Sequence, residues 1–150
     1  MTVLHLNYFL LISLYLFQND SMYGPIIFSA HSMNPTKTFS AGEYITGFAE
    51  FLINVGDSFT LSDGIFTAPR NGIYEFSASV YNDGGPNVLA VVKNGDKVLL
   101  FHDQSNTLSF NWIMDLQKGD HIQLQVDLGS FWCDNFGTLC IFNGKLVKNI

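Results

Sequence analysis

The stretch LSDGIFTAPRNGIYEFSASV, residues 61–80, decides the fold class of this 150-residue chain. After a turn signal at Gly72, apolar and polar residues alternate without a break. The apolar positions are Tyr74, Phe76, Ala78 and Val80, and the polar positions between them are Glu75, Ser77 and Ser79. Because successive side chains of a strand point to opposite faces, one face of this segment is apolar and the other polar. The pattern predicts a strand with a core on one side and water on the other, as in antiparallel sheets.

Segments of the same period recur on both sides of this strand, separated by Gly, Asn, Asp and Pro. They cover residues 26–33, 45–54, 59–61, 88–101, 107–116, 121–128 and 138–147. Within 88–101, Asn94-Gly95 divides two apolar arms, and Asn-Gly is a strong hairpin signal because both residues tolerate positive φ. Eight to ten short strands with frequent turns predict an all-β fold, a two-sheet antiparallel jelly-roll sandwich.

Composition and charge narrow the classes of function. Aromatic residues make up 15% of the chain, with 14 Phe and 13 Gly, which suits strands and turns better than helices. The formal net charge is −6, and the 7 Lys and Arg residues are scattered singly. Without a basic stripe the chain lacks the charge pattern that binds phosphate backbones, so we expect no nucleic-acid partner.

The first twenty residues differ from the rest, because residues 6–17 (LNYFLLISLYLF) are almost wholly apolar. Roughly 12 apolar residues are short for a membrane span and typical of a secretory signal. We therefore expect a leader at 1–21, a globular domain at 22–150 and a secreted, extracellular product. An uncleaved leader would instead hold the chain at a membrane, and a buried strand or helix is the structural alternative.

Cys133 and Cys140 lie seven residues apart, with no spacing typical of a zinc site. In a secreted chain they are able to bridge the two arms of a hairpin, while the alternative is two small buried apolar side chains. Both interpretations stay open at the level of sequence.

Catalytic patterns are weak. Gly56-Asp57-Ser58 is similar to the nucleophile segment of one esterase group, but none of the four His follows an Asp by three residues, as a partner base would. Asp57-Ser58 is better interpreted as a turn, and no catalytic residue and no metal ligand is assigned. Acidic loop residues are able to ligate calcium, yet their spacing matches no calcium loop, so no cofactor is expected.

Residues 26–147 resemble the globular head domain family of complement component one-q, which belongs to the tumour-necrosis-factor-like superfamily. The resemblance rests on residues in the family's order and spacing: Asn54, Gly56, Phe59, Gly64, Phe66, Ala68, Pro69, Gly72, Tyr74, Phe76, Asn94, Gly95, Leu116, Gly119, Asp120, Phe142 and Gly144. Lys145 stands where the family usually has an aromatic residue, and the Gly-X-Y repeat of a collagen stalk is not found.

The resemblance implies a stalkless jelly-roll domain that assembles as a homotrimer and is not an enzyme. Because the jelly-roll pattern is complete and has no catalytic constellation, we expect a recognition module that binds a glycan, a microbial surface or a protein ligand through its loops. Some members of the resembled family also bind calcium. The alternative is a structural protein, such as the trimeric tip of a coat, appendage or matrix. The motif residues identify the fold, so they mark no ligand site.

A contact surface is expected in the segment GSFWCDNFG, residues 129–137, because loops commonly carry function. Its candidate ligand-binding residues are Phe131, Trp132 and Asp134. Trp112 lies within a predicted strand and is assigned to the core instead.

Overall fold

The computed structural model describes residues 23–82, 84–135 and 140–150, and every regular element in these ranges is a strand. The predicted leader, residues 1–21, lies outside the described residues. The strands are β1 (Ile27–Met33), β2 (Lys37–Ser40), β3 (Phe48–Val55), β4 (Phe59–Thr60), β5 (Ile65–Thr67), β6 (Gly72–Tyr81), β7 (Asn87–Lys93), β8 (Asp96–Asp103), β9 (Thr107–Leu116), β10 (His121–Leu128), β11 (Ser130–Cys133) and β12 (Cys140–Asn149). The predicted all-β fold is confirmed.

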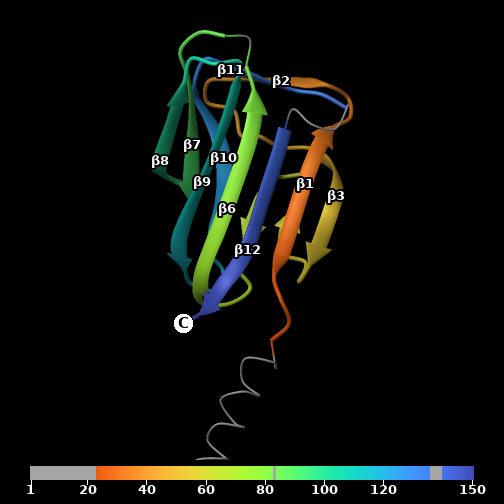
Figure 1. The fold of residues 1–150 in the computed structure, drawn as a ribbon, viewed down its shortest axis with the longest axis vertical. Helices are drawn as coiled ribbons and strands as arrows, with labels where there is room; N and C mark the ends of the chain where they lie inside the picture. Colours follow the sequence, from red (N-terminus) through yellow and green to blue (C-terminus); the bar gives the residue numbers. More distant parts are fainter. Residues whose placement is uncertain (1–22, 83, 136–139) are drawn as a thin grey trace, which may run out of the picture.

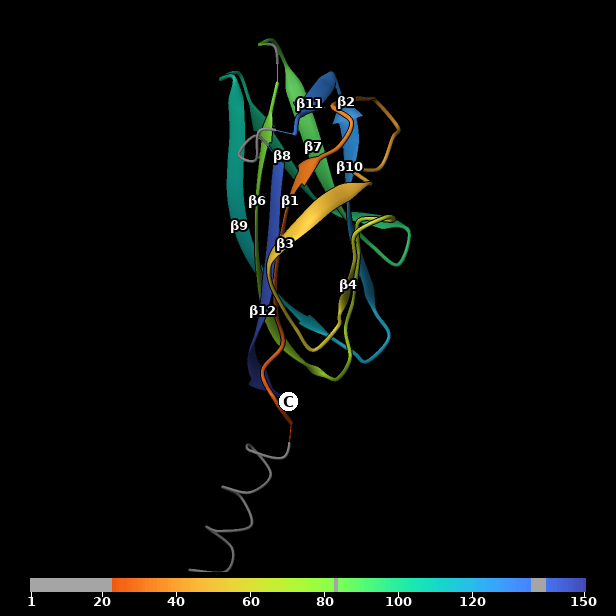
Figure 2. The same cartoon turned by 90° about the vertical axis from the view of Figure 1, so that its right-hand side faces the viewer.

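The strands form two antiparallel sheets packed face to face (Figures 1 and 2). Sheet A has the order β2-β11-β6-β12-β1-β3, with β9 paired to the other edge of β6. Sheet B has the order β4-β5-β10-β7-β8. The first described residues and the C-terminus lie at one end of the sandwich, while β2 and β11 lie at the opposite end, called the apex below (Figure 1).

The alternation in β6 has the predicted consequence. Tyr74, Phe76, Ala78 and Val80 are buried, Glu75, Ser77 and Ser79 are partly exposed, and buried and partly exposed positions alternate along all ten residues. The core between the sheets is rich in aromatic rings. Phe28 stacks on Phe59 with ring centroids 4.4 Å apart, and Phe66 meets Phe76 edge to face at 5.1 Å. Trp112, predicted as core, is buried against Phe76. Such aromatic pairs contribute more than their buried area alone.

At the apex, two short strands were not predicted. β2 lies in a polar segment, and β11 lies in the segment 129–137 that we expected to be a loop. The two strands pair with each other, and β11 joins β6 through Trp132 and Tyr81. Phe131 and Cys133 therefore point inward and are buried. The apex is thus built partly from strand rather than entirely from loop.

Asp120 ties two turns together at the end of the sandwich opposite the apex. Its carboxylate accepts hydrogen bonds from the Asn94 side-chain amide at 2.8 Å and from the Gln117 backbone N–H at 2.9 Å. Lys93 Nζ lies 3.1 Å away. The Asn94 hydrogen bond, assisted by Gln117 and Lys93, holds the pKa of Asp120 below its usual value. The folded state therefore favours the ionised carboxylate.

This network predicts acid sensitivity. A carboxylate with a lowered folded-state pKa stabilises the fold above the unfolded pKa, about 3.9, and loses that contribution as pH falls through the lower value. We expect Asp120→Asn to flatten the dependence of unfolding free energy on pH below about 4. Urea unfolding at a series of pH values measures this slope. An unchanged slope in the variant would show that Asp120 does not carry the effect.

Candidate binding and assembly surfaces

The outer face of sheet A, away from the core, is formed by β3, β1, β12, β6 and β9. The strand register aligns its side chains in rows that cross the sheet. One row contains Val55, Ile27, Lys145, Glu75 and Ile113, and the next contains Ile53, Ser29, Asn143, Ser77 and Asn111. The ends of the first row are apolar, while its middle holds one acid and one base.

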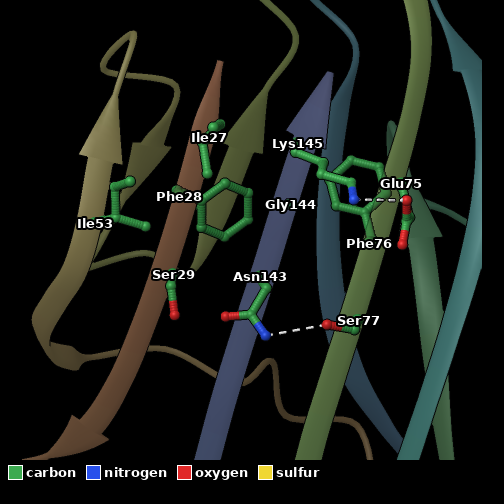
Figure 3. Close-up of a pocket in the computed structure, with 10 residues that line it drawn as sticks. All are labelled: Ile27, Phe28, Ser29, Ile53, Glu75, Phe76, Ser77, Asn143, Gly144 and Lys145. Carbon is green, nitrogen blue, oxygen red and sulfur yellow. Dashed lines mark hydrogen bonds and ion pairs between the residues drawn. The ribbon is translucent and has the colours of Figure 1, made fainter. Parts of the chain in front are cut away.

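A hollow of about 240 Å³ lies where these two rows cross β1, β12 and β6 (Figure 3). Ile27 and Ile53 line one side. On the other side, Lys145 Nζ lies 3.0 Å from Glu75 Oε2, and Asn143 Nδ2 donates to Ser77 Oγ at 3.0 Å. The Lys145 and Glu75 side chains are 53% and 41% exposed, so the ion pair is open to water in a single chain.

Gly144 forms the floor of this hollow. A Cβ there would point into the core, where it would collide with the Phe28 ring and lie 2.8 Å from the Phe76 ring. Only glycine leaves room for both rings beneath β12. Gly144, one of the motif residues that the resemblance rests on, therefore also shapes the hollow.

A second hollow, of about 440 Å³, lies nearer the apex on the same face. Ser79 Oγ and Ser109 Oγ, both in its lining, share a hydrogen bond of 2.8 Å. None of its lining residues is charged: they are Ser77, Ala78, Ser79, Ser109, Phe110, Asn111, Ile141 and Asn143. The outer face of sheet A is therefore hollowed and mostly uncharged.

A different side of the molecule presents large apolar groups. β8 and β9 are edge strands that flank the same side of the sandwich, opposite β3 (Figure 1). We define the β8–β9 edge by its exposed side chains Val98, Leu99, Leu100 and Ile113, of which Leu100 is 60% and Ile113 66% exposed. Phe101 and Phe110 stack at 3.9 Å between the two strands and close the core behind them. The edge is apolar, and no other described residue covers it.

The sequence-predicted contact residues lie at the apex, but the structure separates them. Phe131 is fully buried, so its ring belongs to the core and is not available as a contact group. Asp134 is also buried, and its carbonyl accepts the Met33 N–H at 2.8 Å. Trp132 is half-buried and packs edge to face on Tyr81, with ring centroids 5.7 Å apart. Of the three, Trp132 alone presents an aromatic ring to solvent.

Cys133 and Cys140 are joined by a disulfide whose Cα atoms lie 5.3 Å apart. Both sulfur-bearing side chains are fully buried. The bridge links β11 to β12 and so fixes the strand that carries Trp132. Residues 136–139, which include the end of the predicted contact segment, lie outside the described residues.

The apex loops are held by buried amides. Asn82 Nδ2 donates to the Ser105 carbonyl at 2.8 Å, and Asn87 Oδ1 accepts the Ser130 N–H at 3.0 Å. Asp103 caps its own turn through the Ser105 hydroxyl and the backbone N–H of Ser105 and Gln104. The Ser105 hydrogen bonds hold the pKa of Asp103 below its usual value. These polar groups shape the loops.

The residues considered for catalysis do not converge. Ser58 is buried, and its Oγ has no hydrogen-bond partner among the described residues. Asp57 adopts a positive φ of 43° and accepts a hydrogen bond from Asn54, which fits the turn interpretation. Within residues 23–82, 84–135 and 140–150, no three His, Cys, Asp or Glu side chains gather closely enough to hold a metal ion. The same ranges contain no helix long and apolar enough to cross a membrane.

The fold is shared with solved structures of low sequence identity. The globular domain of zebrafish complement 1qA protein matches with a TM-score of 0.68 at 21% identity, covering 85% of this chain and all of that domain. Eiger TNF from S. frugiperda matches with a TM-score of 0.72 at 10% identity, covering 85% and 96% of the two chains. The architecture is thus a jelly-roll domain of the tumour-necrosis-factor-like type.

The sequence comparisons narrow this class further. The C1q domain model matches residues 25–147, which is most of the chain. This chain belongs to the C1q domain family. A curated relative from Mytilus edulis, named heavy metal-binding protein HIP, is 29% identical over 105 residues. The match covers 66% of this chain and 49% of that protein, so the chain spans about half the relative's length.

Proposed function

We propose that this protein is a secreted, non-enzymatic recognition module that assembles as a homotrimer. The observation that carries the proposal is that one chain has both a hollowed outer face on sheet A and an exposed apolar β8–β9 edge. Membership of the C1q domain family supports it, since such domains are typically trimeric binding modules. Exposed apolar surface of this kind commonly marks an interface.

The two surfaces share Ile113 on β9 at their border, and the rest of the edge lies on β8 in the other sheet, so the edge of one copy cannot seat on its own face. An edge of one copy seated on the face of the next is a heterologous contact, and such contacts close into a ring when the rotation allows. A ring of three would cover the Leu100 and Ile113 side chains and the hollow beside Ile27 and Ile53. The apex loops would stay at one end of the assembly.

Leu100→Asp tests the edge. A charge placed in the centre of an apolar contact must lose its hydration there, so we expect at least about 30-fold weaker assembly, the effect of a typical interface hot spot. Sedimentation velocity on a dilution series measures the dissociation. Leu128→Asp is the matched control, because Leu128 is exposed on β10 away from both surfaces and should leave assembly unchanged. Equal dissociation of the two variants would argue against the β8–β9 edge as an assembly contact.

Recognition is assigned to the apex, where Trp132 and Tyr81 form a partly exposed aromatic pair next to the loops. Aromatic rings at a surface stack on the apolar faces of sugars and anchor protein partners. The family gives the general role, and the glycan or protein ligand of this chain is the finer part of the proposal. The structural alternative, a trimeric tip, has no separate observation in its favour.

A binding screen of the purified chain against defined oligosaccharides, lipopolysaccharide and peptidoglycan tests this assignment. We expect binding to at least one of these probes, weakened about tenfold or more by Trp132→Ala through loss of ring contacts. Assembly mass should be the same for both proteins. Binding that persists unchanged in Trp132→Ala would move the site away from the aromatic pair, and no binding to any probe would contradict glycan recognition.

A further inference from the structure

Lys145 and Glu75 form an ion pair in the middle of the surface that the proposed assembly covers. Their row runs from Val55 and Ile27 on one side to Ile113 on the other, so uncharged side chains flank the pair along the row. The nearest charged groups in other rows of this face are Lys148 and Asp115, both in register with Ile73 one row nearer the C-terminus. His31 and Glu50 lie two rows nearer the apex and contact each other at 3.9 Å. The pair has no net charge, and its neighbours within its own row, Ile27 and Ile113, are apolar.

Covering this row removes both charges from water together. An ion pair that stays intact when buried repays much of its desolvation, whereas one charge left without its partner is strongly unfavourable. In a single chain the same pair is half-exposed, and such pairs contribute little to folding. The pair therefore contributes little to the stability of the single chain, whereas an unmatched charge at its position would strongly weaken any contact that covers it.

The charges around the hollow indicate which surface can occupy it. The hollow beside the pair has an apolar side formed by Ile27 and Ile53, and both of its charges are already compensated, so a fitting partner is apolar and brings no net charge. The β8–β9 edge of a second copy has this chemistry. Val98, Leu99 and Leu100 are uncharged, and the neighbouring Lys97 is already paired with Asp127 on β10. The hollow beside the ion pair and the apolar segment Val98–Leu100 are therefore alike in bringing no net charge to a contact.

We propose that the Lys145–Glu75 pair is the charge-matching element of self-association: a copy assembles when it has both charges or neither, and is rejected when it has one. This inference rests on the proposed trimer and adds to it a rule for which copies join. It assigns to Lys145, which departs from the resembled family, a role on the assembly surface.

Four variants test the rule by sedimentation velocity over a dilution series. We expect Lys145→Met and Glu75→Gln to raise the concentration of half-dissociation at least about 100-fold, because each leaves one buried charge unpaired. The double variant Lys145→Met/Glu75→Met and the reversed pair Lys145→Glu/Glu75→Lys should return to within about tenfold of the parent chain. Lys93→Met, which removes a partly exposed cation at the end opposite the apex, is the control and should assemble normally.

Thermal unfolding of each variant checks that the fold is kept. If a single variant is unstable, the reversed pair still tests the rule, because it has both charges. Single variants that assemble as well as the parent would overturn the inference while leaving the proposed trimer in place. Double and reversed variants as weak as the single ones would also overturn it, since charge matching would not explain them. A parent chain that is monomeric throughout would refute the proposed assembly itself.

Discussion

Phe28→Ala is expected to lower the free energy of unfolding by about 3–5 kcal/mol, the range for truncating a buried aromatic side chain. Phe28 is buried at the centre of the ring cluster. Its ring lies 4.4 Å from Phe59, 5.5 Å from Phe66 and 5.3 Å from Phe142, measured between centroids. These neighbours come from both sheets, so the cavity left by alanine cannot close without moving a strand.

Phe51→Ala is the matched control for this loss. Phe51 contacts the same Phe59 ring at 6.3 Å but is only partly buried on β3. Its truncation removes less apolar surface and leaves a gap that water can enter, so we expect a clearly smaller effect. Urea unfolding followed by tryptophan fluorescence compares the two. Equal losses would mean that the aromatic cluster is not the centre of stability.

Gly64→Ala is expected to cost about 3 kcal/mol or more, because two penalties coincide at one position. Gly64 has a φ of +64°, which side chains disfavour, and a Cβ there would collide with the Ile45 carbonyl oxygen. That oxygen belongs to the backbone, so it cannot move aside cheaply. The motif glycine is therefore required for conformation and for close approach.

Substitutions at two other glycines measure the conformational and the steric penalty one at a time. Gly95 has a φ of +92°, but a methyl group at this position would meet only open space, so Gly95→Ala should show the conformational penalty alone. Gly72 has an ordinary φ but a Cβ would lie 2.8 Å from the Lys148 carbonyl oxygen, so Gly72→Ala should show the steric penalty alone. Unfolding free energies of the three variants check this. A Gly64→Ala loss no larger than that of Gly95→Ala would contradict the proposed collision.

The framework was predictable because its signals are local. The alternation of Tyr74 to Val80 fixes which face of β6 is buried, and the structure confirms it. The Asn94-Gly95 turn likewise joins β7 and β8 as expected, with Asn94 at a φ of +53°. Period and turn chemistry depend on neighbouring residues, so a single sequence contains them.

The apex was harder to predict for a physical reason. β11 has four residues, too few for a convincing period among glycine and polar neighbours. Its alternation was nonetheless present, because Phe131 and Cys133 point inward while Trp132 does not. Phe131, predicted as a contact residue, is buried in the single chain, because the segment that contains it is a strand and not a loop. Applied to this segment, the two-residue period of a strand would have placed Phe131 and Trp132 on opposite faces.

The outer face of sheet A was beyond local prediction. Lys145 and Glu75 are 70 positions apart, and they meet only because β12 and β6 pair in one register. The hollow beside them also requires β1 and β3, from the other end of the chain. Residues brought together by register give no signal in a single sequence. The candidate assembly surface therefore came from the structure.

Assembly through a hollowed face and an apolar edge is the claim on which the proposed function depends. The molar mass of the purified wild-type chain in solution, measured by light scattering across a dilution series, tests it most directly. The account predicts a mass of three chains that falls only on strong dilution. A folded protein with the mass of one chain at every concentration would contradict it.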